Sequence, residues 1–371
     1  MLKIEKIKVN KMPSEIKYIW DELLESSYKP NFQNSSEFIE IWLKSLKENW
    51  EPIILKFIEN ESVIGILGMM SKKQYKNIIF PIRELRILGS PMIDFSVIIC
   101  NKKDSIERIS DSLFLWLRKN KIKWDMAIID NVNDGNPWKL SIENNINKFK
   151  FLGKKSNYYN YYINLKNTWN DIYSKTNKKF VRRNISLYKN RINRDYGSGK
   201  LNYIFNPDWN ANKIINNINK IKKNRKLNGK TELNPIYEEL IIDSSKNNMS
   251  IITFWLSLDG VFIAYGYGFL KENKFYWWQT AYDDNYSKYS PGRLLLYYTL
   301  KYFSENFKSV IEFNFMRGSN SYKSMWTNKY NLMNDYVIFN TTFYGKYIYY
   351  INLSIGYVKF ALKQLASFTK N

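Results

Sequence analysis

The sequence predicts an α/β protein with mixed sheets and flanking helices, built from two similar halves. Two apolar strands joined by a short turn are expected at 53–58 and 63–68, and the same pattern recurs at 251–256 and 261–266. In each half, further apolar strands alternate with segments of helical periodicity, which is the mixed order of an α/β fold. The repetition favours a degenerate internal duplication.

Composition limits the chemistry that the chain can perform. With 371 residues, of which 44% are hydrophobic, it can bury a core large enough for two domains. Its one cysteine, Cys100, excludes an intrachain disulfide and fits a reducing, cytoplasmic setting. The absence of histidine excludes Ser-His-Asp catalysis and His-ligated metals, so no metal site is expected. Catalysis would have to use carboxylates, Tyr, Lys, Arg, amides or backbone donors.

The first half alternates helices and strands. Ser35 precedes a stripe of apolar residues and is expected to cap a helix, while Glu59-Asn60-Glu61 marks a hairpin turn. The helices predicted in this half are at 14–26, 35–48 and 105–119, and the strands are at 52–58, 62–70, 78–81, 95–100 and 126–130.

The second half follows a polar stretch, 131–147, which contains Gly135 and Pro137 and is interpreted as the connection between the halves. Asp259-Gly260 is a strong hairpin signal between two apolar strands. The predicted helices are at 178–194, 209–227 and 235–246, and the strands are at 158–165, 249–257 and 261–269. The predicted division is an N-terminal lobe at 1–150, a C-terminal lobe at 151–342 and an amphipathic helical tail at 343–371.

Positive charge is concentrated in one segment of this basic chain, whose net charge is +23. Between Lys175 and Lys230 there are 16 Lys and Arg residues against two acids, Asp195 and Asp208, a net charge of 16 − 2 = +14. Such a cluster indicates either a polyanionic or phosphate-bearing partner or a solvated helix face.

The stretch 276–326 has the pattern of a strand, a polar turn, a helix, a second strand and a glycine-containing turn. Ser290 can cap the helix, Pro291 suits its first position, and Gly292 permits close approach of a ligand to the backbone. Free amides at a helix start attract phosphate, and Arg293 adds charge and donors. The alternative is that these residues only begin a helix.

The order and spacing of three segments in this stretch resemble the CelD/BcsL-type acyltransferases. The segments are Tyr282 to Gly292, Phe313 to Gly318, and Tyr322 to Trp326. That family belongs to the GNAT superfamily and is built, like the related FemABX proteins, from two tandem GNAT-like lobes. The resemblance covers most of the chain and is stronger from residue 178 onward.

The resemblance implies a coenzyme A site. In GNAT proteins the loop that opens the corresponding helix holds the coenzyme A pyrophosphate, here Ser290, Pro291, Gly292 and Arg293, so acetyl-CoA or another acyl-CoA is the expected co-substrate. The acids of the family pattern correspond to Asn314 and Asn320 in this chain, which puts a general base there in doubt.

Candidate catalytic and acceptor-binding residues surround this site. Asp283, Asp284 and Glu312 are each candidates for the general base, although each could be a turn or surface acid with the amine attacking unaided. Tyr322 is a candidate either to protonate the leaving thiolate or to orient the acceptor, and the alternative is a tyrosine at the rim of a turn. The residues predicted to contact the acceptor are Arg182, Arg183, Tyr282, Asn314, Arg317 and Lys323.

We therefore expect a cytoplasmic acyltransferase that moves an acyl group, in the first place acetyl, from a CoA thioester to an amine or hydroxyl. The resemblance implies a small-molecule or lipid-linked sugar acceptor for the cell envelope or a polysaccharide. One alternative is a FemABX-like aminoacyl transferase that uses charged tRNA, and another is a non-catalytic nucleic-acid-binding protein. The tail at 343–371 would either lie on an anionic membrane surface, at the inner face, or pack on its own lobe.

Overall fold

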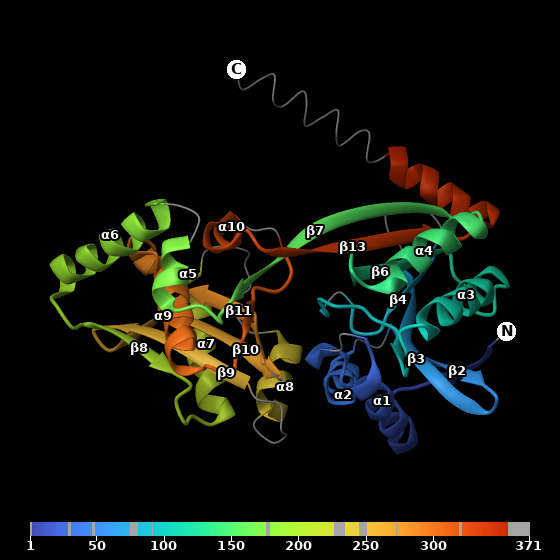
Figure 1. Cartoon of the computed structure of the whole chain (residues 1–371), viewed down its shortest axis with the longest axis horizontal. Helices are drawn as coiled ribbons and strands as arrows, with labels where there is room; N and C mark the ends of the chain where they lie inside the picture. Colours follow the sequence, from blue (N-terminus) through green and yellow to red (C-terminus); the bar gives the residue numbers. More distant parts are fainter. Residues whose placement is uncertain are drawn as a thin grey trace. The chain divides into compact units, whose positions relative to one another are not determined.

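The computed structural model describes residues 2–28, 31–46, 49–74, 81–90, 92–175, 179–225, 234–244, 251–271, 273–318 and 321–354. The chain divides into two compact units (Figure 1). The first unit contains Met1–Asn157 and Met333–Asn371, and the second contains Tyr158–Leu332. The lobes predicted from the sequence are continuous stretches of the chain, whereas these units are defined by contacts between residues. The predicted division into lobes stays a prediction.

The first unit is a mixed sheet with helices around it. Its elements are β1 (Lys3–Lys8), α1 (Ser14–Ser26), the 3-10 helix η1 (Phe32–Asn34), α2 (Ser36–Lys44), β2 (Glu51–Glu59), β3 (Ser62–Gln74), β4 (Ile82–Ile87), β5 (Ile99–Cys100), α3 (Ser105–Arg118), β6 (Met126–Asn133) and α4 (Pro137–Lys148). To these are added β13 (Tyr330–Phe339) and a C-terminal helix at 343–354.

In this sheet the strands lie in the order β1-β2-β3-β4-β6-β13, and β5 pairs with β3. The pair β4 and β6 is parallel, with Glu84 opposite Met126, and the other pairs are antiparallel. The centre of the sheet consists of fully buried Ile54, Leu55 and Ile66. These strands are apolar on both faces because helices cover them.

The second unit repeats this plan. Its elements are the part of β7 (Leu152–Asn164) from Tyr158 onward, α5 (Trp169–Lys175), α6 (Lys179–Tyr196), β8 (Leu201–Phe205), α7 (Ala211–Lys223), α8 (Pro235–Ser244), β9 (Ile251–Leu258), β10 (Val261–Lys271), β11 (Lys274–Tyr282), the 3-10 helix η2 (Asp284–Tyr289), α9 (Pro291–Asn306), β12 (Glu312–Asn314) and α10 (Ser321–Trp326).

The sheet of the second unit has the order β8-β9-β10-β11-β12-β7, with β11 and β12 parallel. Side chains of successive strand residues point to opposite faces of a sheet, so neighbouring residues of one strand pack in different cores. Phe254 packs with α9 residues such as Leu300, whereas its neighbour Trp255 packs with α7 residues such as Ile218.

Both units thus contain an antiparallel hairpin, a third antiparallel strand, a helix and a strand parallel to the third. The series is β2-β3-β4-α3-β6 in the first unit and β9-β10-β11-α9-β12 in the second. This confirms the predicted α/β class with two similar halves.

The final strand of each sheet departs from chain order. β7 follows α4 of the first unit, but its residues Tyr162–Asn164 pair with β12 of the second unit. β13 follows α10 of the second unit, but its residues Met333–Phe339 pair with β6 of the first. Each sheet is therefore completed by a strand that follows a helix of the other unit.

Three helices, α4, α5 and α10, were not predicted from the sequence, and others were predicted too short or too long. The polar stretch interpreted as a connection contains α4, which begins with Asn136 accepting a hydrogen bond from the Trp138 amide and with Pro137 at its first turn. Trp138 and Ile142 anchor it in the core. The strand expected at 95–100 is only β5, and the strand expected at 78–81 falls largely on residues outside the described ones. Among the helices that the structure describes, none has the length and apolar character needed to cross a bilayer.

Candidate functional site

The parallel strands β11 and β12 pair only at their beginnings. Lys274–Tyr276 lie opposite Glu312–Asn314, and there the described pairing ends, although β11 continues to Tyr282. Beyond Asn314, the amide of Phe315 donates to the carbonyl of Tyr161 on β7. The two strands therefore part where the chain enters the turns that lead to α9 and α10.

A β-bulge lies in β11 where its pairing with β12 ends. Against β10, Tyr267 pairs with Gln279 and Gly268 pairs with Trp277, so Trp278 is the extra residue. A Cβ on Gly268 would lie 2.1 Å from the carbonyl oxygen of Tyr276. Only glycine permits this approach, and bulges of this kind re-aim the strand next to functional sites.

Asp283 ends β11 and forms the turn that follows. It is buried, and one carboxylate oxygen accepts from the amide of Asn285 at 2.9 Å while the other accepts from Asn224 of the α7 C-terminus at 2.7 Å. Asp284 is the half-buried first residue of η2. Asp283 thus accepts two hydrogen bonds that stabilise the polar turn.

The start of α9 differs from the capped helix expected from Ser-Pro-Gly. Ser290 has left-handed backbone angles, φ 48° and ψ 58°, and its side chain caps nothing within the described chain. The reason is that η2 runs directly into α9, which leaves no extended residue for a side-chain cap. Pro291 occupies the first turn, and an added Cβ on Gly292 would lie 3.3 Å from the Tyr282 ring.

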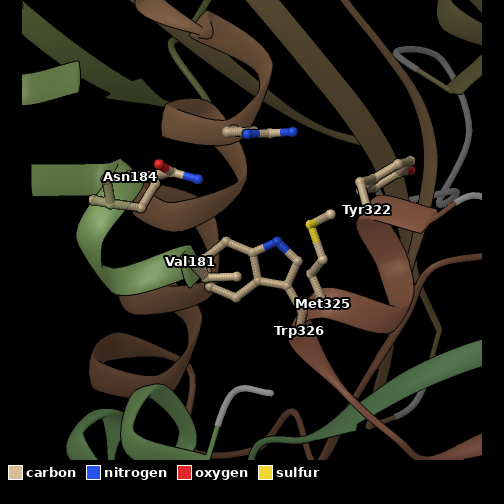
Figure 2. A pocket seen from close by; sticks show the side chains of 7 residues that line it. Val181, Asn184, Tyr322, Met325 and Trp326 are labelled. Carbon is tan, nitrogen blue, oxygen red and sulfur yellow. The ribbon is translucent and has the colours of Figure 1, made fainter. Parts of the chain in front are cut away.

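Arg293 extends from α9 toward α6 and α10. Its guanidinium donates to the hydroxyl of Tyr188 on α6 at 3.1 Å. It lines a small pocket whose other members come from α6 and α10: Val181, Asn184, Ile185, Tyr322, Met325 and Trp326. In Figure 2, Asn184 and Val181 face Met325, Trp326 and Tyr322 across this pocket. The cavity measures about 10 Å³, room for about one water molecule.

Tyr322 lies in the first turn of α10, against the core residue Phe315. Burial raises the pKa of Tyr322 to about 12. The phenol therefore stays protonated throughout the neutral range, as a proton donor must. Tyr322 and Arg293 are the two predicted residues that the structure brings together in one pocket.

Asn314 is buried at the end of β12 and uses its whole amide group. Its Nδ2 donates to Oδ1 of Asn160 at 3.1 Å and to Glu312 at 3.1 Å, and Asn160 donates back to its Oδ1 at 3.0 Å. The same Oδ1 accepts from the amide of Met316, which has a left-handed φ of 59°. Asn314 therefore turns the chain out of the sheet.

Lys323 is buried beneath the same turn. Its ammonium donates to the carbonyls of Met316 and Arg317, at 3.2 and 2.6 Å. Arg317 itself is exposed, with its guanidinium 5.2 Å from the ring centre of Tyr158. Of the residues predicted to contact the acceptor, Asn314 and Lys323 thus shape the turn, whereas Arg317 lies at the surface.

The basic helix α6 divides into two parts. Arg182 and Arg183 are exposed and do not line the pocket, although neighbouring Val181 does. The C-terminal part is fastened to η2, because Arg191 donates to the carbonyl of Lys288 at 2.6 Å and Tyr289 donates to Asp195 at 2.8 Å. Part of the positive cluster therefore holds the loop before α9.

Sequence reasoning missed the contributions of Asn184 and Tyr188 from α6, and of Asn160 from β7. The 3.6-residue spacing of α6 identifies its inner face, but no sequence signal says which other helix that face meets. The glycines in the pattern Gly266-Tyr-Gly268 were a signal for the bulge, since glycine inside a strand indicates close backbone approach.

A larger cavity, of about 480 Å³, lies in the first unit and contains none of the predicted site residues. Its charged side chains pair with each other, Arg108 with Glu59 and Lys148 with Asp111. Within the described ranges, no three His, Cys, Asp or Glu side chains gather as a metal site would require.

Residues 218–324 match a family described as the acetyltransferase (GNAT) domain. The match begins in α7, ends in α10 and includes the bulge, the α9 start and Tyr322. None of the curated proteins matches this chain.

Three solved structures share the fold over most of the chain. FemX has 11% identity and a TM-score of 0.54, covering 89% of this chain and 96% of FemX. A tandem GNAT protein from the clavulanic acid biosynthesis pathway has 9% identity and a TM-score of 0.52, covering 90% and 98%. The C-terminal domain of a putative lysylphosphatidylglycerol synthetase from Agrobacterium fabrum has 10% identity and a TM-score of 0.50, covering 87% and 91%.

At these identities the three structures establish the fold. Together with the matched GNAT domain, they support the prediction that the chain is an acyltransferase. They do not distinguish the CelD/BcsL type from other tandem GNAT proteins.

The stability contributed by the hydrogen bonds between α6 and η2 should depend on pH through Asp195. Hydrogen bonds from Tyr289, Lys288 and Arg194 lower the pKa of Asp195 from 3.8 to about 2. A lowered folded-state pKa gives stability that is present above the unfolded value and is lost as pH falls toward the folded value. We expect Asp195→Asn to lower the urea midpoint at neutral pH and to bring it closer to the wild-type midpoint near pH 2.

Asp259→Asn, which removes only the partner of Lys200, is the matched control. If the difference between wild type and Asp195→Asn is the same at both pH values, Asp195 does not titrate as this geometry requires.

Proposed function

We propose that this protein transfers an acyl group, in the first place acetyl, from coenzyme A to an amine or hydroxyl of a cell-envelope sugar or polysaccharide precursor. The observation that carries this proposal is that β11 and β12 part after three paired residues, and that the helices following them bring Arg293 and Tyr322 to one pocket. A donor bound between the parted strands would meet a phosphate-binding helix start and a proton donor.

The donor pyrophosphate would bind at the start of α9. The amides of Arg293 and Leu294 both donate to the Ser290 carbonyl, and Pro291 has no amide hydrogen. The Gly292 amide is one of the donors that a helix leaves without an intrahelical acceptor. With the helix dipole and the charge of Arg293, it suits a phosphate oxygen. Ser290, Pro291, Gly292 and Arg293 remain our proposed donor-binding residues.

The chemical step needs few groups from the protein. The acceptor nitrogen or oxygen attacks the thioester carbonyl carbon, and the π electrons of the carbonyl move to its oxygen. The resulting tetrahedral intermediate then re-forms the carbonyl and breaks the carbon–sulfur bond. The departing thiolate takes a proton, and protonated Tyr322 is the proposed source. The acceptor loses a proton to solvent or to a base. Tyr322 is then reprotonated by that proton, which closes the balance.

Two of the three candidates for the general base already accept hydrogen bonds. Asp283 accepts from Asn224 and Asn285, and Glu312 accepts from Asn314. We retain Asp283, Asp284 and Glu312 as candidates. A neutral amine held in place could attack without one.

The acceptor is proposed from the family resemblance. Exposed Arg182, Arg183 and Arg317 could hold phosphates of a lipid-linked or nucleotide-linked sugar. The other proposed acceptor-binding residues, Tyr282, Asn314 and Lys323, would shape the inner wall of the acceptor site. We also propose a cytoplasmic location.

Aminoacyl transfer from charged tRNA is the second candidate function. It is favoured by the fold of FemX and of the lysylphosphatidylglycerol synthetase domain and by the exposed arginines of α6.

A charge at the start of α9 should separate binding from folding. We expect Gly292→Asp to weaken acetyl-CoA binding at least about tenfold, because a carboxylate there repels phosphate, while the fold persists because acids are favourable in a first helical turn. Gly292→Ala, which adds the Cβ without charge, is the matched control. Isothermal titration measures both; equal affinities for the two variants would remove this helix start from the donor site.

Removing the Tyr322 hydroxyl should slow the chemical step. We expect Tyr322→Phe to reduce kcat about a hundredfold or more with little change in KM, since a positioned general acid contributes about 10² or more. Tyr298→Phe, a half-buried tyrosine on α9 stacked on Tyr203, is the control. An unchanged kcat would assign Tyr322 to packing. Assays supply acetyl-CoA with amino sugars, and separately aminoacyl-tRNA, so that each proposed donor is tested.

A further inference from the structure

A row of aromatic side chains stands in solvent on the C-terminal helix, residues 343–354. Phe343 is 89% exposed, Tyr347 is 45% exposed and Tyr350 is 59% exposed. Their spacing, i, i+4 and i+7, places the three rings on one face of the helix. Single exposed apolar residues are ordinary, but a contiguous aromatic row is typical of an interaction surface.

The opposite face of this helix fixes its orientation. Ile348 is fully buried in a cluster with Ile82, Met126 and Phe339. A Cβ on Gly345 would lie 2.2 Å from the carbonyl oxygen of Asn340, so glycine lets the helix pack closely at this point. The helix is therefore anchored on the first unit, and the aromatic row faces away from that anchor.

The charge of this segment indicates what the row would meet. Lys346 is exposed beside it. In the sequence from 343 to 371, four residues are Lys (346, 359, 363 and 370) and none is Asp or Glu. The whole chain carries a net charge of +23. An acidic, hydrated surface would thus be attracted to it, and a basic one repelled.

We propose that this helix docks the protein on an anionic lipid surface, with Phe343, Tyr347 and Tyr350 entering the boundary between headgroups and acyl chains. Phenylalanine contributes apolar area, and tyrosine suits a boundary where one end of the ring is apolar and the other wet. Lys346 and the lysines that follow add attraction to acidic headgroups. This docking is independent of the acyl-transfer proposal, because it needs neither donor nor acceptor.

Vesicle co-sedimentation of the full chain tests the proposal. The vesicles are phosphatidylcholine alone, and phosphatidylcholine mixed with phosphatidylglycerol. We expect the wild type to bind the mixed vesicles, less at high salt, and to bind phosphatidylcholine at least about tenfold more weakly. The variant Phe343→Ser, Tyr347→Ser, Tyr350→Ser should lose about tenfold or more of its binding to the mixed vesicles.

The control is Tyr18→Ser on α1, which removes a ring that is 71% exposed elsewhere on the same unit. It should bind like the wild type, and unchanged thermal unfolding of both variants shows that the fold is kept. The proposal is overturned if the triple variant still binds as the wild type does, or if the wild type does not distinguish the two vesicles. It is equally overturned if the row instead joins two copies, seen as a wild-type dimer in light scattering that the triple variant loses.

Discussion

The buried amide of Asn314 is the interaction on which the second unit's site depends. It ends β12 by bonding to Asn160 across the sheet and to the Met316 amide in the turn. Leaving one such buried group unpaired costs about 1–3 kcal/mol. Because β12 stops here while β11 continues, the strands part and α10 can bring Tyr322 beside Arg293.

The same geometry explains why this chain has an amide where the resembled family usually has an acid. An ionised Asp at 314 could not donate to Asn160 or to Glu312, since carboxylates only accept. It would also lie close to the Glu312 carboxylate, which now accepts from Asn314 at 3.1 Å. Asn314 therefore completes a satisfied buried hydrogen-bond network that an ionised acid could not make. In the proposed reaction a base would then have to come from Asp283, Asp284 or Glu312, or positioning of the amine would have to suffice.

Local patterns made the elements of the fold predictable. The Asp259-Gly260 turn, the apolar strands beside it and the Pro-Gly start of α9 each determine a local conformation. The exchange of the last strands was not predictable, because β7 and β13 have the same period-2 pattern whichever sheet they join. Likewise α4 was missed because its few buried residues, Trp138 and Ile142, are separated by polar ones.

The site was predictable in part for the same reason. Ser290 to Arg293 and Tyr322 lie in one stretch of sequence, so local pattern and family resemblance could point to both, and the structure brings Arg293 and Tyr322 to one pocket. The contribution of α6 depends on contacts between residues about a hundred positions apart, such as Tyr188 with Arg293. Not every cation of the basic segment is available to a partner, since Arg191 bonds the Lys288 carbonyl and Lys189 lies over the rings of Tyr297 and Tyr298.

In the proposed function an acyl-CoA binds where β11 and β12 part. Hydrogen–deuterium exchange with and without acetyl-CoA tests it most directly, because it reports binding segment by segment without a known acceptor. We expect slower exchange at 276–282 and at 290–294 when acetyl-CoA is added, and little change in β2 and β3. Protection absent from those segments, or produced there only by tRNA, would contradict it.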